Sequence, residues 1–224
     1  MADVIPAPLQ PRLRVLGSDD AWFPVRRLYC VGRNFADHAR EMGAAVPAAA
    51  DRGTPVFFLK PADALVPGGG DIPYPPGTSV LHHEVELVVA LGDGARVFGY
   101  GIGLDLTRRD LQAAAKAAGL PWDTGKSFDH AAPASALLPA DAVGALDPRR
   151  LSLEVDGEVR QSSTLGHMIW SVPDILHELS KLYALRAGDL VFMGTPAGVG
   201  PLVPGNRFRA TLDDLLELRG AIVD

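Results

Sequence analysis

Cysteine is nearly absent from this sequence, because Cys30 is the only one among 224 residues. A single thiol excludes an intrachain disulfide and any metal cluster built from several thiolates, and it is typical of a reducing compartment. Cys30 stands between Tyr29 and Val31, so we expect a small buried apolar residue rather than a nucleophile. The cysteine content therefore predicts a cytoplasmic protein.

Long apolar runs and an excess of positive charge are also missing. No apolar stretch approaches the ~20 residues needed to span a bilayer, and the start, MADVIPAPLQPRLRV, lacks the basic and apolar parts of a signal peptide. Lys and Arg number 21 against 27 Asp and Glu, which gives a net charge of -6. We therefore expect neither nucleic acid nor a membrane as partner, and an anionic substrate must be held by local charges.

Glycine and proline, in contrast, are plentiful, with 24 and 19 residues that cluster between short apolar runs. This pattern is typical of many strands joined by irregular loops. The hydrophobic fraction of 47% is enough for a sizeable core. The sequence therefore predicts an α+β fold that is mostly β, with a few short helices.

Apolar and β-branched residues predict the positions of the strands. The sequence LSLEVDGEVRQ predicts a hairpin, because alternating residues flank Asp156-Gly157, a dipeptide suited to a type I′ turn. Another strand is expected at the start of GDLVFMGTPAGVG. Further strands are predicted at residues 28–32, 56–60, 79–91 and 97–106.

Capping residues predict three helices. The first lies between Asn34 as N-cap and Gly43 as C-terminal stop. The second opens at Thr107, with Asp110 completing an approximate capping box, and runs to about residue 119. Ser171 caps the third, which runs from about 173 to 185.

The motif HHEVEL is the strongest local signal for chemistry. Side chains alternate along a strand, so Glu84, Glu86 and His82 share one face. A solvent-exposed polar face is the ordinary interpretation of such a pattern. The neighbouring residues 87–91 are apolar, however, and unpaired buried carboxylates are costly, which favours a cation between the two glutamates.

Asp105 ends another apolar run and can supply a third carboxylate, although a helix cap or turn is an equally ordinary role for it. Three carboxylates without cysteine suit a hard ion such as Mg2+ or Mn2+. His82 and His83 are then expected to pack around the site rather than bind the metal.

His38 and Glu41 are three residues apart on the first predicted helix, so the carboxylate can orient the imidazole as a general base. Two solvated residues on an exposed helix are the alternative.

Weaker candidates surround these motifs. Lys126 is by default a surface lysine, and Arg109 and Gln112 can both reach toward the metal from one helix face. Thr195 lies in a GTP turn whose hydroxyl and N–H groups can hold a carboxylate.

Six segments together resemble the fumarylacetoacetate hydrolase family in order and spacing. They are YCVGRNFADHAREMG, FFLKPADALVPGGG, LHHEVELVVALG, GLDLTRRDLQ, GKSFDHAAP and GDLVFMGTPAGVGP. The resemblance implies a mixed β-roll of the C-terminal-domain type, usually dimeric, with a divalent metal. It places a catalytic domain at residues 27–224, after a lead-in segment at 1–26. The connection after Gly92 is shorter than the family pattern.

The resemblance also implies roles for individual residues. It gives the metal ligands as Glu84, Glu86 and Asp105, the catalytic pair on a lid helix as His38 and Glu41, the active-site lysine as Lys126, and the substrate contacts as Arg109, Gln112 and Thr195.

The family's small members imply hydrolysis of a carbon-carbon bond in an acylpyruvate. We expect fumarylpyruvate to give fumarate and pyruvate, as in gentisate-type aromatic catabolism. The protein is expected to be a homodimer, and its substrate is expected to be a small anionic keto acid. Arg33, beside the lid helix, is a candidate for the distal carboxylate. An oxaloacetate decarboxylase or a hydroxymuconate-type isomerase on the same site is an alternative, as is a non-catalytic metal-bound binding protein.

Overall fold

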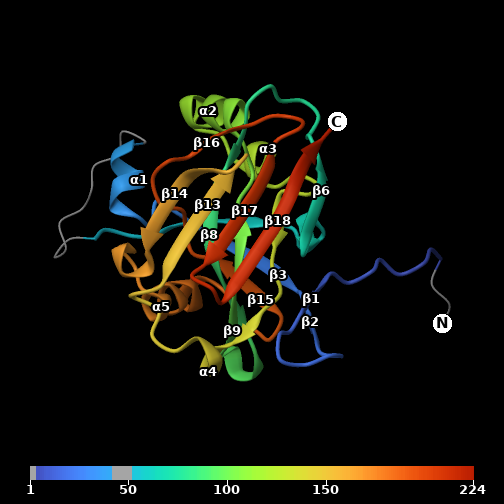
Figure 1. Ribbon diagram of the computed structural model, residues 1–224, viewed down its shortest axis with the longest axis vertical. Coiled ribbons are helices and arrows are strands. Elements are labelled where there is room, and N and C mark those ends of the chain that lie inside the picture. Colours follow the sequence, from blue (N-terminus) through green and yellow to red (C-terminus); the bar gives the residue numbers. More distant parts are fainter. Residues whose placement is uncertain (1–3, 42–51) are drawn as a thin grey trace.

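An eight-stranded sheet runs through the centre of the molecule. The computed structural model describes residues 4–41 and 52–224, and Figure 1 shows the strands of this sheet behind a second sheet. The strand order is β4-β3-β15-β8-β9-β11-β5, with β12 paired to β9. The strands are β3 (Arg27–Gly32), β4 (Val56–Lys60), β5 (Leu65–Pro67), β8 (Val85–Leu91), β9 (Val97–Leu104), β11 (Ala132–Ala134), β12 (Leu138–Pro139) and β15 (Asp189–Phe192).

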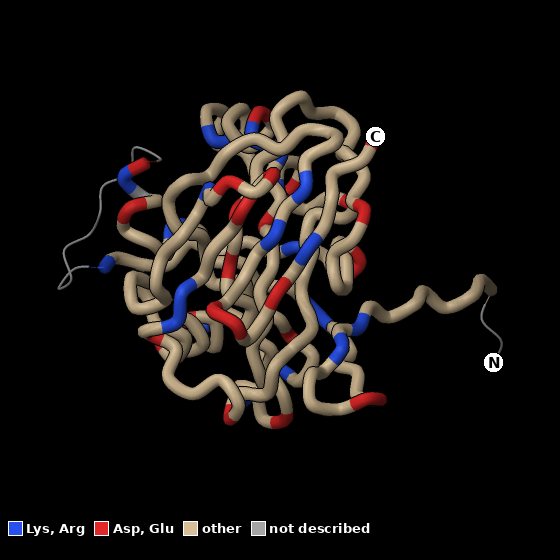
Figure 2. Tube along the Cα trace, in the orientation of Figure 1, with Lys and Arg blue, Asp and Glu red and all other residues tan. Residues whose placement is uncertain are grey.

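The second sheet has five strands in the order β14-β13-β17-β18-β6. Charged residues alternate with buried ones along β13, β17 and β18, and Figure 2 shows acidic and basic residues interspersed along the strands of this sheet. Glu217 lies between two arginines, with 2.7 Å to Arg209 Nε and 2.5 Å to Arg219 Nε. The strands are β6 (Gly69–Pro73), β13 (Arg150–Val155), β14 (Glu158–Thr164), β17 (Arg207–Leu212) and β18 (Leu216–Val223).

Two small sheets and short helices complete the described residues. One small sheet pairs β1 (Arg12–Arg14) with β2 (Trp22–Pro24). In the other, β7 (Leu81–His83) lies between β10 (Thr107–Arg108) and β16 (Gly200–Leu202). The α-helices are α1 (Ala36–Glu41), α2 (Arg109–Ala118), α3 (Asp123–Lys126), α4 (Ala140–Val143) and α5 (Val172–Leu182). Short 3-10 turns are η1 (Ala62–Ala64), η2 (Asp93–Ala95) and η3 (Leu165–His167).

Both parallel and antiparallel pairs occur within the sheets. β15 pairs with β3 in parallel and with β8 in antiparallel orientation. The prediction of a mostly β, mixed α+β fold is therefore confirmed. Among the described residues, no helix is long and apolar enough to cross a membrane.

Strand β8 is buried on both faces, which explains its continuous apolar sequence. Leu87 and Val89 belong to the larger core, which lies between the two big sheets and under α5. Val88 and Ala90 point the other way into a second core, and the lead-in strands close it with Leu13 and Phe23. Since side chains alternate, Glu86 shares the face of Val88 and Ala90 and lies at the end of this second core.

The predicted strand at 79–91 is in fact two strands that separate at Glu84. β7 pairs with β10 and β16, whereas β8 pairs with β9 and β15, so the chain passes from one sheet to another at this residue. The backbone N–H of Asp105 donates to the Glu84 carbonyl oxygen at 2.8 Å. The change of sheet thus brings Glu84 next to Asp105.

Two predicted helix starts are wrong. Thr107 pairs with His82 in β10, and its hydroxyl donates to the Asp105 carbonyl at 3.0 Å, so α2 begins two residues later at Arg109. Asp110 accepts hydrogen bonds from Thr78 Oγ1 (2.5 Å) and the Ser79 N–H (3.1 Å) instead of forming a capping box with Thr107.

Asn34 does not cap α1, because its side chain binds the backbone of Trp170 and Met193. The expected stop at Gly43 lies outside the described residues. Local sequence cannot show these choices, since the competing partners are distant in the chain.

Other local predictions are confirmed. Ser171 and Asp174 form a reciprocal capping box at the start of α5, although the helix ends at Leu182 rather than near 185. Asp156 and Gly157 have φ values of 52° and 81°, as a type I′ turn requires. The short connection after Gly92 is the turn η2, closed by a hydrogen bond from the Gly92 N–H to the Arg96 carbonyl at 2.8 Å.

Candidate active site

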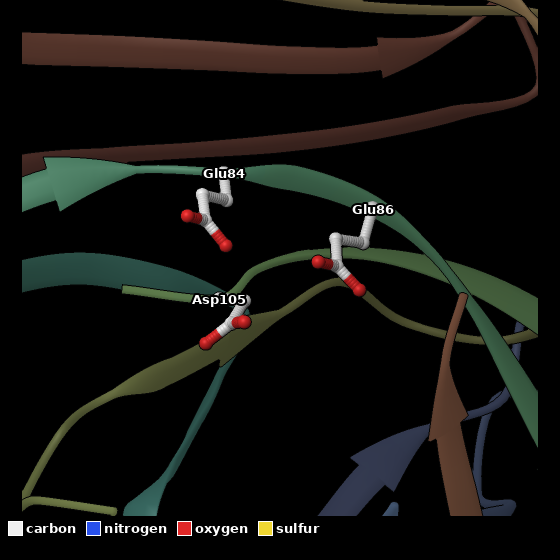
Figure 3. Close-up of side chains that lie close together, drawn as sticks. All are labelled: Glu84, Glu86 and Asp105. Carbon is white, nitrogen blue, oxygen red and sulfur yellow. The ribbon is translucent and has the colours of Figure 1, made fainter. Parts of the chain in front are cut away.

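Three buried carboxylates converge at the start of β8 and the end of β9. Glu84 precedes β8, Glu86 lies on it, and Asp105 follows β9, whose residue Leu104 pairs with Val85. One carboxylate oxygen of each residue lies within 4.8 Å of the others, and Figure 3 shows the side chains extending toward a common space. The sequence pattern predicted this grouping.

Backbone from the loop after β15 holds one of these acids. The Gly194 N–H donates to Glu86 Oε2 at 2.7 Å. Gly194 has a φ of 87°, and a Cβ there would lie 2.7 Å from the Cβ of Asn34. Only glycine therefore lets this N–H approach Glu86 without displacing Asn34.

Three cationic side chains surround the acids. Lys126 Nζ lies 2.8 Å from Glu84 Oε2 and also binds Asp105 Oδ2, while Arg109 binds Glu84 Oε1. Lys60, which sequence analysis did not single out, is buried with Nζ 2.9 Å from Asp105 Oδ1. Lys126 is thus a buried residue of this site rather than a surface lysine.

These contacts shift the pKa values of the acids in opposite directions. Burial alone would raise the pKa of Glu84, but the charges of Lys126 and Arg109 outweigh burial and hold that pKa well below its usual range. Burial, followed by the negative charges of Asp105 and Glu84, raises the pKa of Glu86 well above its usual range. Burial would lower the pKa of Lys126, but Asp105 and Glu84 raise it, so this lysine stays protonated.

The three acids fit a hard divalent cation. Asp105 Oδ1 is buried and accepts no hydrogen bond from the described residues, although Lys60 Nζ, which donates to the carbonyls of Leu106 and Lys126, lies 2.9 Å away as an ion-pair partner. Among the residues that the structure describes, no lysine or arginine forms an ion pair with Glu86. The site thus offers only oxygen ligands. One of them, Asp105 Oδ1, accepts no hydrogen bond, and another, Glu86, has no cationic partner. Such a site matches the preferences of Mg2+ and Mn2+.

Metal affinity should therefore increase with pH. Glu86 keeps its proton to higher pH than an ordinary carboxyl, and only the ionised form can bind a cation, so binding must displace the proton. Calorimetric titration with Mg2+ in buffers of different ionisation enthalpy should detect this proton release. Glu86→Gln should remove it, and pH-independent affinity from mildly acidic to neutral solution in the unaltered protein would contradict the prediction.

His38 and Glu41 form a pair on α1. His38 Nδ1 lies 3.3 Å from Glu41 Oε2, and the Gly198 N–H lies 3.2 Å from both carboxylate oxygens. The His38 side chain is buried whereas Glu41 is 37% exposed, so the acid holds the imidazole from outside. The two residues are therefore not independent solvated charges.

Nine of the ten candidate residues line one cavity, and Glu41 stands behind His38. The cavity measures about 30 Å3, which is room for an ion or a water molecule. The nine lining residues are Arg33, His38, Glu84, Glu86, Asp105, Arg109, Gln112, Lys126 and Thr195.

One polar residue that the sequence did not mark, Gln161, helps to hold this arrangement together. Gln161 Nε2 donates to Thr195 Oγ1 at 2.7 Å, and its Oε1 accepts from the Val85 N–H at 3.0 Å and contacts His83. Arg109 Nε donates to His82 Nδ1 at 3.3 Å. No local motif marks Gln161, because it lies about 80 residues along the chain from the strand that it supports.

The paired histidines contact neighbouring side chains rather than the acids. Burial and then the charge of Arg109 lower the pKa of His82 to about 4, so His82 is neutral and accepts the arginine hydrogen bond. His83 bonds to Gln161, and burial lowers its pKa as well.

Comparison with known proteins identifies the family. The model of the fumarylacetoacetate (FAA) hydrolase C-terminal domain matches residues 27–223. The chain belongs to the fumarylacetoacetate hydrolase family. Its fold is that of the C-terminal domain of this family of enzymes, as the resemblance implied.

Solved structures support the same assignment. The fumarylpyruvate hydrolase from Pseudomonas aeruginosa, in complex with Mn2+ and pyruvate, is 44% identical, with a TM-score of 0.93 and 99% of each chain covered. A putative fumarylpyruvate hydrolase from Burkholderia cenocepacia is 47% identical, with a TM-score of 0.90, 100% of this chain covered and 99% of that chain.

A curated relative carries a different name. The mitochondrial oxaloacetate tautomerase FAHD1 from Arabidopsis thaliana is 41% identical over 203 residues, which are 86% of this chain and 89% of that protein. Its named substrate is the one considered in the alternative above, but tautomerisation was not among the reactions that the sequence analysis considered.

Proposed function

We propose that this member of the fumarylacetoacetate hydrolase family is a metal-dependent hydrolase that cuts fumarylpyruvate into fumarate and pyruvate. The observation that carries the proposal is a single cavity lined by a three-carboxylate centre, by His38, which Glu41 contacts from behind, and by a protonated Lys126. Similarity to the Pseudomonas fumarylpyruvate hydrolase with Mn2+ and pyruvate supports it.

Glu84, Glu86 and Asp105 would hold Mg2+ or Mn2+. When bound, such an ion acts as a Lewis acid that polarises keto and carboxylate oxygens of the substrate. Arg109, Gln112 and Thr195 line the same cavity and would orient the pyruvate half, whose carboxylate needs donors or positive charge.

His38 would activate the water that attacks the remote carbonyl. Its Nδ1 faces Glu41, so Nδ1–H donates to the carboxylate and Nε2 is left free to accept a proton. The hydroxyl adds to the carbonyl carbon, and the bond to the neighbouring methylene carbon then breaks. The acyl half leaves as fumarate, and the methylene carbon takes a proton to give pyruvate.

Lys126 would stabilise the negative charge that develops on the departing pyruvate half. The pKa of its ammonium is raised, so it cannot serve as a base and stays positively charged. Its Nζ is held by Glu84, Asp105 and Thr107 Oγ1, the last at 2.7 Å, which fixes the charge in place before substrate binds.

A second candidate activity acts on oxaloacetate, which the Arabidopsis relative favours. Tautomerisation moves a proton between carbon and oxygen, and decarboxylation loses carbon dioxide, so neither needs an attacking water. The same cation and Lys126 would serve both reactions, while His38 would be needed for water activation only in hydrolysis.

Several finer expectations stay predictions. The family resemblance alone implies the role in gentisate-type aromatic catabolism, the homodimer and the boundary between a lead-in at 1–26 and a domain at 27–224. The cytoplasmic location rests on the single cysteine.

A substrate panel tests the proposal. Fumarylpyruvate, acetylpyruvate and oxaloacetate are each incubated with the protein and Mg2+ or Mn2+, and products are followed by nuclear magnetic resonance. We expect the highest kcat/KM for fumarylpyruvate, with equal amounts of fumarate and pyruvate. Rapid change of oxaloacetate with no cleavage of either acylpyruvate would replace hydrolysis with the second candidate.

A further inference from the structure

Two cations at the cavity wall are not used by the acidic centre. Arg109 and Lys126 are bound to Glu84 and Asp105. Lys116 and Arg33 line the same cavity, but neither belongs to an ion pair among the described residues. Lys116 was not a candidate in the sequence, yet it lies on α2 seven residues after Arg109, on the same helix face.

Like charges crowd around Lys116. Burial and then the charges of Arg109, Arg33 and Lys126 lower the pKa of Lys116. Glu84 and Asp105 compensate Arg109 and Lys126, whereas Lys116 and Arg33 are solvent-exposed and pair with no carboxylate among the described residues. This end of the cavity therefore carries uncompensated positive charge. An anionic group arriving there would compensate this charge.

Aromatic side chains shape this end of the cavity. Lys116 Nζ lies 4.8 Å from the centre of the Trp122 ring, and Trp122 packs against Phe58 with ring centres 6.2 Å apart. Trp122 and Phe58 also line an adjoining groove of about 350 Å3. They form an apolar wall along which an extended acyl chain can lie, with the ammonium group beside it.

Arg33 is presented by an unusual backbone conformation. Its φ is 61°, in the left-handed region that residues other than glycine seldom occupy. It directly precedes Asn34, whose side chain is fixed by the backbone of Trp170 and Met193. The surrounding structure therefore holds Arg33 in a conformation that places its side chain at the cavity.

We propose that Lys116 and Arg33 form a second carboxylate-binding site at the aromatic end of the cavity, which makes the enzyme selective for keto acids with a carboxylate at each end. The inference rests on the proposed function for the identity of the substrate. It assigns Lys116 to substrate binding and Trp122 to contact with the acyl chain.

The test compares two ligands of equal length, 2-oxoheptanedioate and 2-oxoheptanoate. Both carry the keto-acid end, only the first has a distal carboxylate, and neither has a remote carbonyl at which it could be cleaved. Calorimetry on the full-length protein loaded with Mg2+ should show about tenfold tighter binding of the diacid, the effect of one well-placed charged contact.

Lys116→Met should weaken diacid binding about tenfold and leave monoacid binding unchanged, while Lys116→Arg should retain the preference. Lys181→Met is the matched control, because Lys181 is an exposed lysine on α5 that pairs with Glu178. Equal affinity for the two ligands, no diacid binding, or equal weakening of both by Lys116→Met would overturn the inference. If the protein binds the diacid more tightly but does not cleave fumarylpyruvate, the proposed reaction is contradicted and the inference about the second carboxylate site is not.

Discussion

Asp105→Asn should abolish turnover and weaken binding of Mg2+ and Mn2+ by about 100-fold or more, since it removes a charged ligand rather than a supporting contact. The replacement keeps the shape of the side chain but leaves a single oxygen, without negative charge, near the position of the cation. Glu84→Gln should have the same effect, because Glu84 is one of the three converging acids.

Both variants also disturb the buried lysines. Asp105 is paired with Lys60 and Lys126, so its neutralisation leaves positive charge uncompensated and should lower the free energy of unfolding by about 3–5 kcal/mol. Circular dichroism must therefore show that the variants remain folded at the assay temperature. Asp71→Asn, an exposed residue on β6, is the control and should bind metal normally. Normal metal affinity in folded Asp105→Asn would show that the ion binds elsewhere.

His38→Ala should lower hydrolysis of fumarylpyruvate by about 100-fold or more, the usual contribution of a positioned general base. Any decarboxylation of oxaloacetate should decrease much less, because that reaction needs no activated water. The buried His38 lies at the cavity and its only carboxylate partner among the described residues is Glu41. Glu41→Gln should therefore cause a smaller loss of hydrolysis than removal of the imidazole itself.

Comparison of the two activities in one variant is the informative measurement. His177→Ala, an exposed histidine on α5, serves as the control and should leave both rates unchanged. Equal loss of hydrolysis and of oxaloacetate decarboxylation in His38→Ala would show that the imidazole does not act specifically on water. Full hydrolysis in the variant would remove His38 from the mechanism.

Much of the acidic centre could be predicted, because its elements obey local rules. Alternation along a strand placed Glu84 and Glu86 on one side, and the end of an apolar run placed Asp105 near them. The actual geometry depends on a feature that no local rule contains, namely the change of sheet at Glu84. That break bends the chain at the point where the acids meet.

Errors arose where a residue had a distant partner. Thr107 has the local pattern of a helix cap, yet its backbone pairs with His82 in a β-sheet and its hydroxyl accepts a hydrogen bond from Lys126. Asn34 likewise binds Trp170 across the fold. Ser171 was predicted correctly because its partner Asp174 lies three residues away.

The missed residues follow the same principle. Lys60 ends a strand with nothing in VFFLK to distinguish it from a surface lysine, and only the fold places its ammonium beside Asp105. Lys116 offered a usable signal, since it lies four residues after Gln112 and seven after Arg109, on the same helix face. Positions 42–51, which include the end of the proposed lid helix, lie outside the described residues, so the lid remains a prediction.

Cleavage of fumarylpyruvate by metal-depleted and metal-restored protein tests the central claim most directly. Protein treated with a strong chelator and then freed of it is assayed for fumarate and pyruvate before and after addition of Mg2+ or Mn2+. The carboxylate centre at Glu84, Glu86 and Asp105 predicts no cleavage without metal and restored formation of both products in equal amounts with it. Undiminished cleavage by the metal-depleted protein, or restored activity that yields no fumarate, would contradict it.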